Sequence, residues 1–356
     1  MAKYLSEKDI RVGVIGVGRM GRNHCRVLST MRHVLLAGVT DLDGDAGREV
    51  AGRYETTFYR SVAELFAAVD AVVIATPTPS HFPLAMQAMA CGIHVLIEKP
   101  IAATLAEAEE LVKAAATYGT VVQVGHIERF NPAYTELKHV LDEINVAAIN
   151  FRRLSPYVGS NTDVDVVLDL MIHDLDLALD LVQQPPLSVS AVGLTAFSGD
   201  IDHAVVQLSF PAAPLLTIMV SRLTEQKVRS IDVTGLEAYV EGDLLNKRLL
   251  LHRSMTGEYL HHNQHTIKYR QESMVERIHV PLAEPLLLEL QHFINCIVEG
   301  QQPLVSAVAG WEALALATQI RDKIRADLTV VQPANHKTLT GRSLSRLVTP
   351  VEQCQA

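Results

Sequence analysis

The chain has 356 residues, of which 48% are hydrophobic and 20% are charged, and its formal net charge is -9. This length is enough for two domains, and the acidic balance argues against a nucleic-acid partner, because such surfaces need concentrated basic residues. No stretch reaches the ~18 uninterrupted apolar residues of a membrane span, and the N-terminus lacks an apolar signal core. The four cysteines are scattered without metal-binding spacing. We therefore expect a cytoplasmic protein with no membrane contact and no metal.

A glycine-rich turn follows the first predicted strand. An apolar run from Ile10 reaches Gly16, and the spacing of Gly16, Gly18 and Gly21 then opens a helical pattern. In a dinucleotide-binding βαβ unit the first glycine makes the tight turn, the second lets the backbone approach a pyrophosphate, and the third lets the helix pack on the strand. The residues expected to contact the cofactor in this loop are Gly16, Gly18, Arg19, Met20 and Gly21.

An acidic residue at the end of the second strand strengthens that interpretation. The apolar run 33–40 ends at Asp41, 20 residues after Gly21, where a carboxylate would hold the adenosine ribose hydroxyls. No Lys or Arg follows before Arg48. The pattern therefore predicts NAD rather than NADP as the cofactor.

Strands and helices then alternate as in a doubly wound parallel sheet. The wholly apolar run 71–75 is typical of a strand buried on both faces, and the last strand of the unit is 121–124. The loop after residue 75 lies at the carboxyl edge, where such sheets bind ligands, so Thr76, Pro77 and His81 are candidate cofactor contacts. The alternative is a proline-rich turn that only starts the next helix. This Rossmann unit is expected to cover residues 1–127.

A charged corner ends the strand 93–97. Glu98 and Lys99 are followed by Pro100, which can take a cis bond, and this arrangement indicates a lysine held in a fixed direction. The alternative is a solvated Lys99 paired with Glu98, the commoner outcome for a charged dipeptide.

The second half begins with a strand over 146–154 and a long helical stretch over 164–182. Asp169, His173, Asp176 and Asp180 fall at helical intervals and are expected to share one face of it. On this pattern alone His173 could simply be buried and paired with Asp169 or Asp176. A metal site would need a third ligand, which no nearby Cys or His supplies. The histidines at 261, 262 and 265 are expected in a polar hairpin loop.

Five strand-like runs between 187 and 241, separated by turn residues, predict a broad and mainly antiparallel sheet. One face would pack on helices, including those expected over 284–299 and 307–325, and the other would be available for a second copy of the chain. We expect a homodimer or homotetramer formed through this sheet. The second domain is expected over 128–331, with a tail at 332–356.

Taken together, these motifs resemble the Gfo/Idh/MocA family of sugar oxidoreductases. The resemblance runs from about residue 10 to residue 325 and rests on four motifs, which are Gly16/Gly18/Gly21, Thr76 to His81, Glu98-Lys99-Pro100 and Asp169-x-x-x-His173. It implies an NAD-binding Rossmann domain, with Glu98 and Lys99 beside the cofactor. It also implies that Lys99 reaches the reacting carbon and that Asp169 and His173 face it from the second domain.

A narrower signature, Gly125-His126-x-Glu128-Arg129-Phe130-Asn131-Pro132-Ala133, resembles the branch that acts on nucleotide sugars. The chain lacks the glycine run that many family members carry near 163–168, which argues against free monosaccharides as substrates. The expected substrate contacts are Lys99, Arg129, Asn131, Arg153, Tyr157, Asp169 and His173. Arg129 and Arg152 or Arg153 would bind the diphosphate. Alternatively, Arg129 pairs with Glu128 or Asp169 as an interdomain strut.

The chemistry requires a base for a hydroxyl proton while hydride leaves the same carbon. A histidine, with an ordinary pKa of about 6.5, suits that task better than a lysine at about 10.4. His173 is therefore the expected base, Lys99 stabilises the alkoxide, and Asp169 orients His173 or binds a sugar hydroxyl. Lys99 with a depressed pKa is the alternative base.

The expected function is NAD-dependent oxidation at C3 of UDP-N-acetylglucosamine. One alternative is a glycosidase that uses transient C3 oxidation. Others are a dehydrogenase of another sugar or polyol and an NAD-binding regulator without catalysis.

Overall fold

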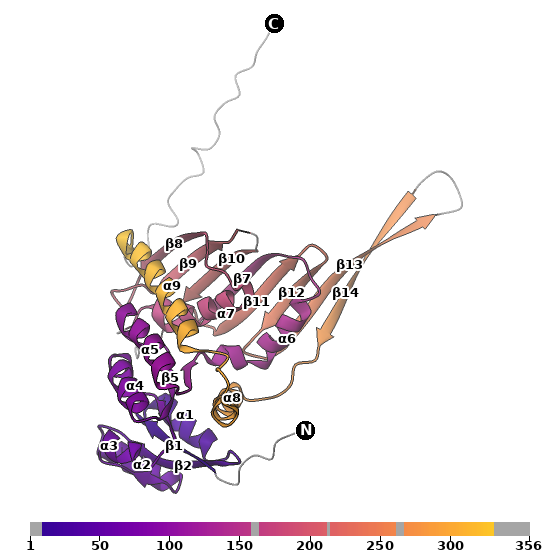
Figure 1. The fold of residues 1–356 in the computed structure, drawn as a ribbon. Coiled ribbons are helices and arrows are strands. Elements are labelled where there is room, and N and C mark those ends of the chain that lie inside the picture. Colours follow the sequence, from indigo (N-terminus) through magenta and orange to yellow (C-terminus); the bar gives the residue numbers. More distant parts are fainter. Residues whose placement is uncertain (1–8, 158–163, 212–213, 261–266, 331–356) are drawn as a thin grey trace.

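The computed structural model describes residues 9–157, 164–211, 214–260 and 267–330 (Figure 1). Two sheets dominate these residues. The expected tail at 332–356 and the histidines at 261, 262 and 265 lie outside the described residues.

The first sheet has six parallel strands in the order β3-β2-β1-β4-β5-β6. Its strands are β1 (Ile10–Ile15), β2 (Val34–Thr40), β3 (Thr57–Phe58), β4 (Ala71–Ile74), β5 (His94–Glu98) and β6 (Val122–Gly125). Its helices are α1 (Arg19–Leu28), α2 (Gly44–Arg53), α3 (Val62–Phe66), α4 (His81–Ala90) and α5 (Leu105–Tyr118). Every residue of β4 is buried, as its uninterrupted apolar run predicts. The predicted doubly wound sheet is confirmed.

The strand order reverses between β1 and β4, and such a switch point is where open α/β sheets bind ligands. The glycine turn after β1, the Thr76 loop after β4 and Lys99 after β5 all follow the carboxyl ends of neighbouring parallel strands. They therefore meet at one edge of the sheet.

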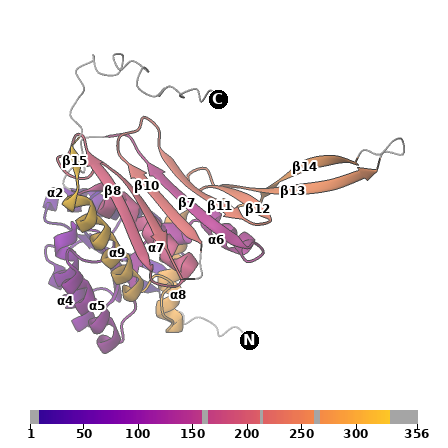
Figure 2. The same ribbon diagram turned by 90° about the horizontal axis from the view of Figure 1, so that it is seen from above.

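The second sheet has nine strands in the order β14-β13-β12-β11-β7-β10-β9-β8-β15. They are β7 (Val146–Leu154), β8 (Ser188–Thr195), β9 (His203–Ser209), β10 (Leu215–Ser221), β11 (Val228–Gly235), β12 (Ala238–Asp243), β13 (Arg248–Leu260), β14 (Ile267–Ile278) and β15 (Thr329–Val330). Pairing is antiparallel except between β7 and β10 and between β8 and β15. The mainly antiparallel sheet is confirmed. A hairpin loop was expected around residues 261–265, but the two long strands β13 and β14 were not predicted, and they project from the body in Figures 1 and 2.

One face of this sheet packs on helices α6 (Pro132–Leu141), α7 (Ile172–Val182) and α9 (Ala307–Ala326), as Figure 2 shows. Alternation along β7 points Ile149 and Phe151 into this core, both almost fully buried, and leaves Arg152 exposed on the other face. Truncating a buried phenylalanine such as Phe151 to alanine costs about 3–5 kcal/mol. The helix-covered face therefore holds the core of the second half.

Helix α8 (Pro285–Glu299) follows the second sheet in the chain but packs on the first unit, where Leu290 and Phe293 join the core under β1. The segment before α9 pairs with the edge of the first sheet, since Val124 N donates to Val305 O at 2.9 Å. The two units are therefore joined by apolar packing and by main-chain hydrogen bonding.

Candidate active site

The glycine turn has the shape that a dinucleotide requires. Gly16 has φ +87°, which favours glycine, and a Cβ at Gly21 would lie 1.8 Å from the Gly16 carbonyl oxygen. A Cβ at Gly18 would meet nothing within 4 Å, so the backbone there is open to a ligand. Asp41 accepts hydrogen bonds from Val17 N at 2.6 Å and from Asp43 N at 2.8 Å, which places its carboxylate beside the turn. These residues fit a bound NAD.

His81 ties two loops of this edge together. Its side chain is 1% exposed, with Nδ1 2.9 Å from Pro100 O and Nε2 2.9 Å from Thr76 O. A ring buried in this way cannot reach a cofactor, so the expected contact by His81 is corrected to a positioning role. Thr76 and Pro77 remain accessible at this edge, and their contact with a cofactor stays a prediction.

Glu98 and Lys99 point to different partners. Glu98 is buried, and its Oε1 lies 2.7 Å from Nε2 of the fully buried His24. Burial raises the pKa of Glu98, but the His24 hydrogen bond and the nearby charges outweigh it, so this pKa lies below its ordinary value. The alternative in which Lys99 pairs with Glu98 is therefore wrong. The peptide bond between Lys99 and Pro100 is cis.

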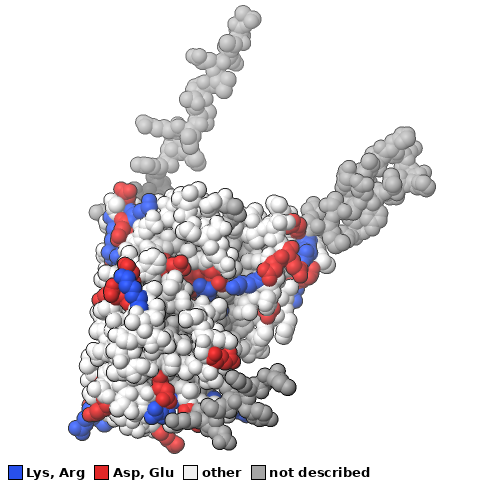
Figure 3. All heavy atoms as spheres, in the orientation of Figure 1, with Lys and Arg blue, Asp and Glu red and all other residues white. Residues whose placement is uncertain are grey.

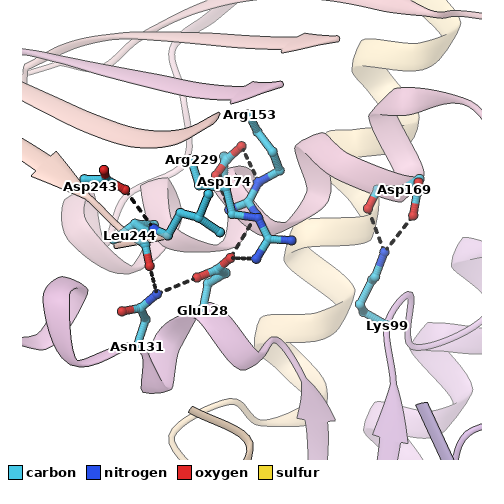
Figure 4. Close-up of polar contacts among 10 residues, drawn as sticks. Lys99, Glu128, Asn131, Arg153, Asp169, Asp174, Arg229, Asp243 and Leu244 are labelled. Carbon is cyan, nitrogen blue, oxygen red and sulfur yellow. Dashed lines mark hydrogen bonds and ion pairs between the residues drawn. The ribbon is translucent and has the colours of Figure 1, made fainter. Parts of the chain in front are cut away.

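Lys99 crosses to the second domain. Its Nζ donates to the main-chain oxygen of Asp169 at 2.6 Å and to Asp169 Oδ1 at 3.2 Å (Figure 4). Asp169 lies in a π-helical turn, Val167–Met171, that precedes α7, whereas the sequence predicted one continuous helix. Such turns are common at functional sites. Asp165 starts this turn by accepting from Val167 N at 2.9 Å. Asp169 therefore positions Lys99, and no hydrogen bond joins Asp169 to His173.

His173 lines the cavity, and its Nδ1 is buried without a hydrogen-bond partner among the described residues. Its ring stands edge-on to His126 at 6.2 Å between centroids. Burial, followed by the charges of Lys99 and Arg153, lowers the pKa of His173 well below its ordinary value. The alternative in which His173 pairs locally with Asp169 or Asp176 is wrong. His173 is neutral near pH 7 and can accept a proton.

A cavity of about 580 Å³ opens between the two units. Eight of the predicted site residues, from both units, line it, namely Arg19, Met20, Glu98, Lys99, Arg153, Tyr157, Asp169 and His173. Tyr157 is 39% exposed, and its ring packs on Phe197 with the centroids 5.1 Å apart. The two halves of the predicted site therefore form one interdomain surface.

Two expected substrate contacts do not face this cavity. Arg129 is 8% exposed and forms ion pairs with Asp176, at 2.8 Å, and with Asp180, rather than with Glu128 or Asp169. Asn131 is 4% exposed and caps α6, accepting from Ala133 N at 3.1 Å. Both expectations are corrected, because these side chains are already satisfied within the protein.

Arg153 reaches the cavity wall, but each of its three guanidinium nitrogens already donates to a carboxylate. It donates to Asp174 at 2.7 to 3.1 Å and to Glu128 Oε1 at 2.9 Å, with the side chain 3% exposed (Figure 4). Arg229, which was not predicted, donates to the same Glu128 oxygen at 3.1 Å. The signal for Arg229 was its inward register in β11, two residues before Ile231 on the helix-covered face. The diphosphate contact expected of Arg153 is therefore not supported by its pairing.

Other features of the described residues bear on partners. None of their helices is long and apolar enough to cross a membrane, and no three His, Cys, Asp or Glu side chains among them are grouped to hold a metal ion. On the face drawn in Figure 3, basic and acidic side chains are interspersed, and no continuous basic patch is visible there.

A dinucleotide turn, a lysine at a strand end and a neutral histidine facing it across an interdomain cavity define an oxidoreductase that uses a nicotinamide cofactor. Residues 10–126 match the oxidoreductase family with an NAD-binding Rossmann fold, GFO_IDH_MocA, and residues 146–241 match the GFO/IDH/MocA C-terminal domain. The chain belongs to the Gfo/Idh/MocA family, as its motifs predicted.

Relatives with different substrates resemble the chain over nearly its whole length. UDP-N-acetylglucosamine 3-dehydrogenase of Acidithiobacillus ferrooxidans is 33% identical, covering 90% of this chain and 98% of the relative. The solved structure of that protein aligns with TM-score 0.79 and 32% identity over 89% of this chain and 98% of its own. Inositol 2-dehydrogenase of Rhizobium meliloti is 26% identical, covering 86% and 94%. The protein is therefore an oxidoreductase of this family, and its substrate needs a separate argument.

Proposed function

We propose that this protein is an NAD-dependent dehydrogenase that oxidises the C3 hydroxyl of UDP-N-acetylglucosamine to a 3-keto nucleotide sugar. The observation that carries the proposal is the convergence of Lys99, Asp169 and His173 on one cavity at the ligand-binding edge of the NAD-binding sheet. The 33% identity to a UDP-N-acetylglucosamine 3-dehydrogenase supports this choice of substrate.

The residues divide the chemistry between them. A bound nicotinamide would accept the hydride. His173, neutral at pH 7, takes the hydroxyl proton, while the Lys99 ammonium stabilises the negative charge that develops on the oxygen. The main-chain oxygen and carboxylate of Asp169 hold that ammonium in a fixed direction. An alcohol that enters the cavity therefore meets a base and a positive charge together.

The cofactor preference follows from Asp41. Its carboxylate accepts hydrogen bonds from two main-chain amides, and no cation lies beside it among the described residues. The 2′-phosphate of NADP would approach this negative charge, whereas ribose hydroxyls would donate hydrogen bonds to it. We therefore propose NAD as the working cofactor.

The open face of the second sheet is proposed as the subunit contact of a homodimer or homotetramer. Apolar side chains stand on it, including Val192, 66% exposed, and Leu215, 48% exposed. The register from β8 through β9 to β10 aligns Val192 with Val205 and Met219 in one row. Sedimentation of the wild-type protein and of Val192→Glu tests this. Oligomers lost in the variant support the contact, and a wild-type monomer contradicts it.

An activity panel tests the substrate. Purified protein is incubated with NAD and, separately, UDP-N-acetylglucosamine, free N-acetylglucosamine and myo-inositol, and NADH absorbance is followed. The expected result is reduction with the nucleotide sugar alone, abolished in Lys99→Met. A second candidate, a polyol dehydrogenase, is favoured by the similarity to inositol dehydrogenases. NADH formation with myo-inositol but not with UDP-N-acetylglucosamine would replace the proposal with that one.

A further inference from the structure

The rim of the interdomain cavity carries positive charge that the protein does not neutralise. Arg19 begins α1, Lys227 immediately precedes β11, and Arg229 lies within β11. Neither Arg19 nor Lys227 has a hydrogen bond or an ion pair among the described residues, and both side chains are exposed. Arg229 donates one hydrogen bond to Glu128, and its side chain is 33% exposed.

The other cations of the cavity wall are matched by local acceptors. Lys99 has Asp169, Arg26 has Glu284, Arg153 has Asp174 and Glu128, and Arg222 has Asp202 and the Val164 carbonyl oxygen. Arg229 shares the Glu128 oxygen that Arg153 uses, and Arg153 also pairs with Asp174, so two carboxylates serve these two guanidinium groups. The excess of positive charge at the rim therefore comes from Arg19 and Lys227, although the whole chain is acidic.

The rim cations also repel one another. Arg229 is the main cause of a lowered pKa at Lys227, followed by burial and then by Arg19. Burial and then Arg153 lower the pKa of Arg229. Like charges held this close are unfavourable unless an anion joins them.

We propose that Lys227 and Arg229 bind the diphosphate of the nucleotide-sugar substrate, whereas Arg19, at the glycine turn, remains an expected cofactor contact. The inference rests on the proposed function and adds to it the part of the cavity that holds the nucleotide. A diphosphate carries two neighbouring negative charges, and a guanidinium fork matches phosphate oxygens in pairs. The cluster shares its cavity with Lys99 and His173, so one substrate can reach both.

The experiment compares two exposed lysines that have no ion pair with any residue the structure describes. Lys227→Met removes a rim charge, and Lys323→Met removes a charge from the last turn of α9, outside the cavity wall. For Lys227→Met, KM for UDP-N-acetylglucosamine and the inhibition constant of UDP should each rise about tenfold or more, the scale of one charge-assisted hydrogen bond. Neither should change in Lys323→Met.

NAD affinity is measured in the same proteins, because the dinucleotide carries a pyrophosphate of its own. It should be equal in the wild type and in Lys227→Met. Arg229→Lys, which keeps the charge but loses the fork, should weaken UDP binding less than Lys227→Met does. Calorimetric titration with UDP checks binding without turnover.

The outcomes separate this inference from the proposed function. Turnover of UDP-N-acetylglucosamine with unchanged KM and unchanged UDP affinity in Lys227→Met overturns the diphosphate site alone. Loss of NAD affinity instead of UDP affinity also overturns it and assigns the cluster to the cofactor. UDP binding that depends on Lys227, in a protein inert toward UDP-N-acetylglucosamine, supports the site and rejects the proposed sugar. A wild-type protein that does not bind UDP overturns both.

Discussion

Two groups of cations differ in their surroundings, one of buried arginines and one on the rim of the interdomain cavity. In the inner group, Arg129 and Arg153 are buried, and carboxylates accept from both guanidinium groups. In the rim group, Arg19 and Lys227 are exposed and unpaired among the described residues. A buried charge is tolerated only with a local partner, whereas an exposed charge stays solvated until a ligand arrives. Pairing and burial, rather than residue type, therefore separate the structural arginines from the cations proposed to bind the diphosphate.

The largest expected effect comes from breaking the inner group. Arg153→Met leaves Asp174 and Glu128 buried with less compensation, so the free energy of unfolding should fall by about 3–5 kcal/mol. Urea denaturation measures this. The control is Arg152→Met on the opposite face of the same strand, which should change stability by about 0.5 kcal/mol or less. An Arg153→Met protein of wild-type stability that no longer binds UDP would reverse the two assignments.

Lys99 belongs to neither group, because it is paired with Asp169 and yet lines the cavity in which the proposed reaction would take place. Lys99→Met keeps most of the side-chain length but removes the charge, so NAD should still bind. Turnover should fall by about two orders of magnitude or more, the scale of losing one such electrostatic contact. Nearly normal kcat in this variant would remove Lys99 from the chemistry and leave it as an interdomain link to Asp169.

The first sheet was predictable from sequence because its strands are short apolar runs that end in diagnostic residues. Gly16 and Asp41 each follow a strand directly, so the neighbouring sequence alone is enough to place them at its end. The β13–β14 hairpin was missed because the alternation of apolar residues fades along β13 after Leu251, and only the turn signal at its tip remained.

The ion pairs of the inner group could not be predicted from the sequence, because they join residues that are far apart in the chain. Asp176 and Asp180 were predicted to share one face of a helix with Asp169 and His173. Nothing local shows that Arg129 pairs with both, since even Asp176 is 47 residues away in the chain. The π-helical turn at Val167–Met171 has no evident sequence signal. In the structure Asp169 and His173 line the cavity, whereas Asp176 and Asp180 bind Arg129. Which carboxylate meets which cation is decided by tertiary packing.

Asp41 is the negative counterpart of the rim cations, an acid without a basic partner among the described residues. Asp41→Asn keeps the shape but removes the charge, so it should reduce the preference for NAD over NADP by about fivefold to tenfold, the effect of about 1 kcal/mol of like-charge repulsion. The ratio of kcat/KM for the two cofactors measures this. An unchanged ratio, or a wild-type preference for NADP, would contradict the role given to Asp41.

The smallest expected effect is on the pH dependence of kcat/KM, because cations of both groups act on His173. Burial and the charges of Lys99, Arg153 and Arg229, together with His126, lower the pKa of His173 well below 6.5. An ordinary histidine would be about three-quarters protonated at pH 6, and a base of that kind would lose roughly fourfold in rate. With a lowered pKa, His173 stays neutral, so kcat/KM should change less than twofold between pH 7.5 and pH 6.

The lowered pKa of His173 also affects folding stability. The unfolded chain binds a proton at this position below about pH 6.5, whereas the folded chain does not, so the contribution of His173 to stability should be lost as pH falls through that value. Two variants test the contribution of Arg229 to the rate profile. In Arg229→Lys the positive charge remains, so the dependence of kcat/KM on pH should stay flat. In Arg229→Met the charge is lost, so the pKa of His173 should rise and the acid limb should move to higher pH. An acid limb near pH 6.5 in the wild-type protein would show that His173 is not held neutral by these cations, or that another group is the base.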